Sequence, residues 1–190
     1  MRHFSFRPAL TISGRKFKGW RGFAGKPFHP PLTDVPVTAY MFVAAFDVIS
    51  IAVHSSHSEV ARQLYLAGSW TIAGGAGASL LTALTGFFDW WRSSEPGTQA
   101  RRTINAHAIT MIVVTLLVLV DLLVRFIGYP DRSWTPIGIV VISVVAAVLT
   151  FVGATLGGSL VYDYGFNIET GGDHPVWHKS EEDVFPGQKH

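Results

Sequence analysis

The sequence predicts an all-α membrane protein, an up-down bundle of four transmembrane helices with both termini in the cytoplasm. Composition is the first indication, because 48% of the 190 residues are hydrophobic and 15% are charged, whereas a soluble domain has about 25% charged residues. The charges also gather between long apolar runs. Four of these runs meet or approach the roughly 20 residues that a helix needs to cross a bilayer.

The four apolar runs comprise residues 35–53, 64–90, 106–126 and 136–162. Each is expected to be helical, because backbone N–H and C=O groups in lipid must be satisfied within their own segment. The loops between the runs are short, so successive helices should be antiparallel neighbours.

The second run is rich in small residues, among them Gly74, Gly75 and Gly77. Small residues let neighbouring helices approach closely, and close packing is the favoured interpretation. Room for a flat cofactor is the alternative.

The positions of Lys and Arg predict the orientation. Seven of these residues precede the first run, and Arg92, Arg101 and Arg102 lie between the second and the third. The other two loops hold Arg62 and Arg132. The positive-inside rule then puts both termini in the cytoplasm.

The predicted organisation has three parts. Residues 1–34 form a basic cytoplasmic arm with a Pro-rich approach to the membrane, residues 35–162 form the four-helix transmembrane domain, and residues 163–190 form a cytoplasmic tail. The arm interleaves aromatic and basic residues in SGRKFKGWRGF. It is expected to lie on anionic lipid headgroups, and no nucleic-acid partner is expected.

Polar side chains from all four helices should meet at the cytoplasmic end of the bundle. Prolines on both sides of His29 restrict its backbone, as a ligand site would require. A structural interpretation stands beside this one, because helix ends need capping groups. Thr33 or Asp34, followed by Pro36, suits a helix start. The predicted polar cluster consists of His29, Asp34, Asp89, Asn105, His107 and Tyr162.

Four motifs occur in a fixed order: HPPLTDVPV, GFFDWW, RRTINAHA and LGGSLVYDYG. With these motifs the chain, over residues 26–166, resembles the bacterial membrane protein family known as domain of unknown function 2231. Some members of that family have a second His where Asp34 stands. The resemblance implies a multi-pass protein of the bacterial inner membrane with no established activity. Relatives fused to Rieske-type or cytochrome modules imply an association with membrane electron transfer.

The favoured functional hypothesis is a non-catalytic accessory subunit of a membrane electron-transfer complex. Its partners would be the lipid bilayer and a larger membrane protein complex, and no enzymatic activity is expected. His29 and Asp34 would then tie the start of the first helix to Asp89, Arg101, Asn105 or His107.

A haem b-binding electron carrier is the first alternative. Haem in a helix bundle takes axial His ligands from facing helices, and His29 and His107 are the pair expected at equal depth. Arg101 and Arg102 would meet the haem propionates. The chain has no Cys, which excludes covalent c-type haem and thiolate metal sites.

Two further alternatives rest on other polar residues. His29, Asp34, Asp89 and His107 contain the donor types of a zinc or iron site, although no close ligand spacing supports one. Asp47, near the middle of the first run, suggests a small proton or solute transporter, since an intramembrane acid is costly.

Two groups of polar residues near the outer surface are expected to be structural. Asp121 and Arg125 have the spacing of a helical ion pair. His54, His57 and Glu59 have a spacing that could bind a metal, but interfacial side chains without that role are expected.

Overall fold

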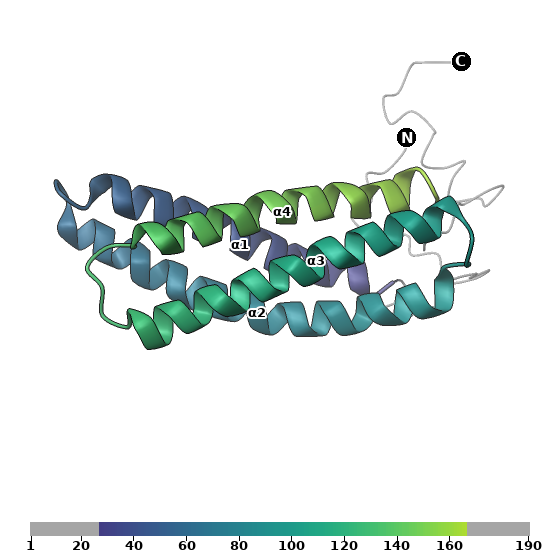
Figure 1. Ribbon diagram of the computed structural model, residues 1–190, viewed down its shortest axis with the longest axis horizontal. Coiled ribbons are helices and arrows are strands. Elements are labelled where there is room, and N and C mark those ends of the chain that lie inside the picture. Colours follow the sequence, from purple (N-terminus) through teal and green to yellow (C-terminus); the bar gives the residue numbers. More distant parts are fainter. Residues whose placement is uncertain (1–26, 167–190) are drawn as a thin grey trace, which may run out of the picture.

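The computed structural model describes residues 27–166, which form an elongated bundle of four long helices (Figure 1). The helices are α1 (His29–Val53), α2 (Ser58–Ser93), α3 (Gln99–Leu123) and α4 (Ile137–Tyr162), and α3 runs on into the π-helical segment η2 (Val124–Gly128). All four, with η2 counted as part of α3, are long and apolar enough to cross a membrane. The predicted four-helix membrane bundle is therefore confirmed. Residues 1–26 of the basic arm and 167–190 of the tail lie outside the described residues.

Helix α1 begins at His29 and not, as predicted, at residue 35. Pro30 and Pro31 occupy its first turn, where a backbone N–H has no partner within the helix and its loss costs nothing. Thr33 is not the N-cap, because its hydroxyl donates back to the carbonyl of Pro30 at 2.6 Å. The Pro-rich approach is thus itself helical.

Pro36 lies inside α1, where it has no N–H to donate to the carbonyl of Leu32 one turn earlier. The hydroxyl of Thr82 on α2 lies 3.2 Å from that carbonyl and 3.0 Å from the carbonyl of Ala78 in its own helix, so it can donate to Leu32 in place of the missing N–H. A proline inside a membrane helix is tolerated when a neighbouring side chain satisfies the freed group, and Thr82 has this role.

The helices pack in sequence order around a ring. Helix α1 packs along α2 and α3 along α4, while α1 also contacts α4 and α2 meets α3 over a shorter stretch. Helices α1 and α3 therefore occupy opposite corners. The buried core includes Tyr40, Val43, Ile72, Val114 and Val118. Many other large apolar side chains face outward, as expected where lipid surrounds the bundle.

The small residues of α2 have two different environments. A Cβ added at Gly75 would lie 2.7 Å from the Cβ of Ala39, so close packing against α1 requires glycine there. Gly74 and Gly77 have no heavy atom within 4 Å of the same position. The expected close packing is thus present at Gly75 alone of these three.

The bundle has two distinct ends (Figure 1). The histidine end holds the start of α1, the turn between α2 and α3 (residues 94–98) and the end of α4. The loop end holds the turn between α1 and α2 (residues 54–57) and the loop between α3 and α4 (residues 129–136). Each end contains a separate polar site.

Candidate functional site

His29 is fixed against α2 at the histidine end. Its Nδ1 lies 3.0 Å from the carbonyl oxygen of Thr82 and 3.2 Å from the hydroxyl of Thr85. The ring also lies against Gly86, where an added Cβ would be 2.7 Å from Cε1. Gly86 follows Thr82 by four residues, one helical turn. Its missing side chain leaves the Thr82 carbonyl open to a donor from outside the helix.

His107 on α3 is fixed against α4 in the same way. Its Nδ1 lies 2.8 Å from the carbonyl oxygen of Gly153. Its ring lies against Gly157, where an added Cβ would be 3.3 Å from Cε1. Gly157 again follows the accepting residue by four positions. The hairpins α1–α2 and α3–α4 therefore share one device, a His that binds a helical carbonyl beside a glycine.

The hydrogen bonds determine the tautomer of both rings. A backbone carbonyl can only accept, so Nδ1 carries the proton in each His and Nε2 keeps its lone pair. Within residues 27–166, neither Nε2 has a hydrogen-bond partner. The two imidazoles are within electrostatic range of each other, although they come from opposite corners of the bundle. Nε2 of each ring therefore has a lone pair that could coordinate a metal ion.

The other members of the predicted polar cluster do not join this pair as one group. Asp89 is buried, at 2% exposure. Asn105 is exposed and accepts a hydrogen bond from the indole N–H of Trp90 at 2.7 Å. Asp34 is exposed, and Tyr162 is 87% exposed. The topology brings these residues to one end, but the helix faces turn Asp34, Asn105 and Tyr162 outward.

The two arginines expected at propionates have local partners. Arg101 donates from Nη1 to the carbonyl oxygens of Trp90 and Ser94, both at 3.2 Å, and to the Ser94 hydroxyl at 2.5 Å. Its guanidinium also lies over the Trp90 ring, 4.0 Å from the centroid. Arg101 thus caps the C-terminus of α2. Arg102 is exposed and donates to Gln99.

The metal-site alternative is not supported. Among residues 27–166, no group of three His, Cys, Asp or Glu side chains is placed to hold a metal ion. Asp34, which was expected to belong to this set, is exposed. At the loop end, His54 binds the carbonyl of Ile51 and Glu59 accepts from Gln63, so the residues around His57 also have separate local partners.

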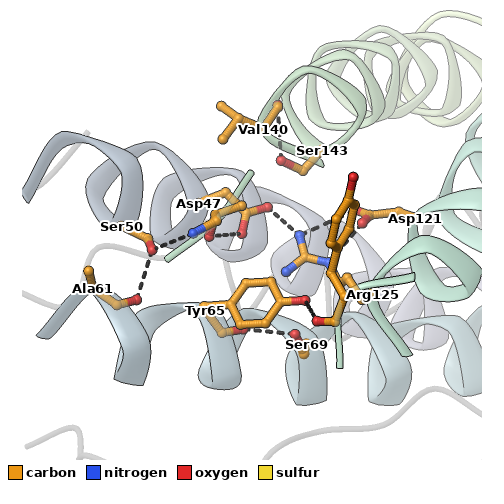
Figure 2. A network of polar contacts seen from close by, with 11 residues as sticks. Asp47, Ser50, Ala61, Tyr65, Ser69, Asp121, Arg125, Val140 and Ser143 are labelled. Carbon is orange, nitrogen blue, oxygen red and sulfur yellow. Dashed lines mark hydrogen bonds and ion pairs between the residues drawn. The ribbon is translucent and has the colours of Figure 1, made fainter. Parts of the chain in front are cut away.

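A buried ionic network occupies the loop end (Figure 2). Arg125 lies between Asp47 and Asp121, and none of the three is more than 1% exposed. Its Nε donates to Asp121 at 2.7 Å and its Nη2 forms an ion pair with Asp47. The Asp121–Arg125 pair predicted from spacing is present, and it is buried inside the bundle. Asp47, the predicted intramembrane acid, belongs to the same network.

The loop between α3 and α4 covers this network. Thr135 donates its hydroxyl to Asp47 at 3.1 Å and its backbone N–H to the Ser50 hydroxyl at 3.0 Å. The Tyr65 hydroxyl donates to the carbonyl of Tyr129 at 2.5 Å. Segment η2 brings Arg125 inward at the end of α3, where the wider turn is closed by the bond from Tyr129 N to Val124 O. The sequence gives no direct signal for this turn.

Comparisons with known proteins agree with this architecture. No curated protein and no solved structure matches the chain. The model of a family described as "Predicted membrane protein (DUF2231)" matches residues 25–170. This match contains all four helices and both polar sites, and the chain therefore belongs to the DUF2231 family of predicted membrane proteins.

Proposed function

We propose that this membrane protein is a haem b-binding electron carrier of the bacterial inner membrane, with His29 and His107 as axial ligands. The observation that carries the proposal is the matched anchoring of the two rings. Each donates Nδ1–H to a backbone carbonyl and keeps Nε2 unused. Histidines that bind metals almost always have such a second hydrogen bond, which fixes the tautomer and the ring orientation.

The position of the pair in the bundle supports the same proposal. The two histidines come from different hairpins, so a flat cofactor held between them would bridge α1–α2 and α3–α4. Axial ligands in helix bundles come from facing helices. With both termini cytoplasmic, the haem would lie near the cytoplasmic surface. Arg102 would reach a propionate without disturbing a helix cap, whereas Arg101 would have to leave the carbonyls of α2.

The accessory-subunit hypothesis explains less of this geometry. A purely structural His would be expected to use both ring nitrogens where partners are available. Here Gly86 and Gly157 admit the two rings in the same orientation. A carrier can also associate with a larger electron-transfer complex, so that partner belongs to both hypotheses. When bound, the haem iron would supply reversible one-electron chemistry, while His29 and His107 would hold it in place.

An absorption spectrum of the purified chain, oxidised and then reduced with dithionite, tests the proposal. We expect a b-type spectrum that is lost in both His29→Ala and His107→Ala. The matched control is His54→Ala, because His54 is exposed at the other end of the bundle. In His107→Met, the reduction potential of the haem should rise, because Met ligation raises it. A purely structural role of His107 would not predict this change.

The opposite result would be a folded chain that stays colourless when haem is supplied during expression. If such a chain migrates with a large complex on a native gel of gently solubilised membranes, the accessory-subunit hypothesis replaces this one. A b-type spectrum that survives both Ala variants would also reject the two ligands.

A further inference from the structure

The ionic network at the loop end has an unbalanced formal charge. Asp47 and Asp121 are both 0% exposed, and Arg125 is 1% exposed. Two ionised carboxylates and one guanidinium would leave one excess negative charge buried inside the bundle. An uncompensated buried charge is strongly unfavourable, so the network requires one further positive charge.

Among the described residues, the elements around the network supply no second cation. Helix α2 contributes the ring of Tyr65, whose centroid lies 5.6 Å from the guanidinium. The loop contributes the neutral hydroxyl of Thr135. Within residues 27–166, Asp47 and Asp121 are the charged groups in electrostatic range of Arg125, and Tyr65 is the other titratable group in contact with the network.

Arg125 does not satisfy both carboxylates equally. Its Nε and Nη2 are directed at the two acids, while Nη1 is buried without a hydrogen-bond partner. Nη2 therefore donates to both carboxylates, and its distance to Asp121 Oδ2 is 3.4 Å. Of the four carboxylate oxygens, Asp121 Oδ2 has the weakest donor. The guanidinium cannot turn Nη1 toward it without giving up Asp47.

We propose that the Asp47–Arg125–Asp121 network is a proton-binding site, and that the proton is held on Asp121 Oδ2. Protonation there leaves the 2.7 Å bond from Arg125 Nε to Asp121 Oδ1 intact and removes the excess charge. A metal cation fits less well, because it needs several free oxygen ligands and donors already contact these carboxylates. This site is separate from the histidine pair and does not depend on haem.

Infrared spectroscopy of the full-length chain in detergent tests the proposal. We expect a carboxylic acid C=O band at neutral pH that shifts in D₂O and is absent in Asp121→Asn. The band should also be absent in Asp47→Asn, although Asp121 remains. In that variant Asp121 and Arg125 balance each other and no proton is required. Arg125→Gln should enlarge the band, because both acids then lack a counter-charge.

Asp89→Asn is the matched control, since Asp89 is the buried acid at the histidine end. The proposal predicts that this variant keeps the band. A wild-type chain without a carboxylic acid band, or a band lost in Asp89→Asn alone, would overturn it. A band that persists in Asp47→Asn but not in Asp121→Asn would show that burial, and not the charge balance, holds the proton. The wild-type measurement stands even if a variant fails to fold. In haem-loaded protein, the comparison with Asp121→Asn separates this band from any band of the haem propionates.

Discussion

Two hydrogen bonds at His29 and Thr82 join α1 to α2, one donated by each helix. The ring of His29 lies 3.0 Å from the Thr82 carbonyl, and the Thr82 hydroxyl donates to the carbonyl of Leu32 at 3.2 Å. The second bond is possible because Pro36 leaves the Leu32 carbonyl without its helical donor. The Pro-rich start of α1 is thus a helix that depends on its neighbour, and Thr82 connects its histidine to its proline.

Thr82→Val should therefore destabilise the bundle by about 1 kcal/mol. The change keeps the shape of the side chain but leaves the Leu32 carbonyl without a donor in a membrane helix. Unfolding in mixed micelles of mild detergent and dodecyl sulfate measures the effect. Thr155→Val is the matched control, because the Thr155 hydroxyl bonds to Phe151 in its own helix, as the Thr82 hydroxyl also does to Ala78. Equal losses in the two variants would contradict the cross-helix role of Thr82.

Gly86→Ala should displace the ring of His29. The added Cβ would lie 2.7 Å from Cε1, closer than real contacts allow, whereas Gly157→Ala would place it 3.3 Å from His107. Overpacking of this kind costs about 1–3 kcal/mol, so Gly86→Ala should be the more harmful of the two. Gly77→Ala meets open space and should be neutral or slightly stabilising. Mixed-micelle unfolding ranks the three, and a Gly77→Ala loss as large as that of Gly86→Ala would refute the steric argument.

Arg125→Gln should be far more destabilising than Asp47→Asn. Removing the guanidinium leaves two buried acids without a counter-charge, at a cost of about 3–5 kcal/mol. Asp47→Asn instead removes one of the two acids, so that Asp121 and Arg125 balance each other without a bound proton, and its amide oxygen can still accept from the hydroxyl of Thr135. The same unfolding assay compares them, with Arg132→Gln as the control, since Arg132 is exposed on the nearby loop. An Asp47→Asn variant as unstable as Arg125→Gln would contradict the charge imbalance.

The number, order and approximate positions of the helices could be predicted because lipid imposes one simple requirement on the backbone. The start of α1 could not, since Pro36 normally marks a helix boundary and is tolerated here through Thr82. Thr33 or Asp34 is therefore the cap that the sequence alone predicts. What was missing was the tertiary partner of the Leu32 carbonyl.

The histidine pair was expected from topology, but its orientation was not. That depends on the register between neighbouring helices, which puts Gly86 opposite His29 and Gly157 opposite His107. A signal was present, because both glycines lie in motifs that the sequence singles out. The partnership of Asp47 with Arg125 was missed for a different reason. Arg125 looks like an interfacial charge until η2 turns it into the bundle.

Tyr65→Phe should loosen the loop between α3 and α4. The hydroxyl of Tyr65 holds the carbonyl of Tyr129, so its removal should ease local opening by about 1 kcal/mol. Hydrogen exchange over residues 129–136 should then accelerate about fivefold. Tyr40→Phe removes a comparable bond, from Tyr40 to Ser79 within the α1–α2 interface, and should leave exchange in the loop unchanged. Unaltered exchange in Tyr65→Phe would mean that Thr135, through Ser50 and Asp47, is enough to hold the loop closed. Faster exchange would identify the Tyr65–Tyr129 bond as a principal restraint on water access to the buried carboxylates.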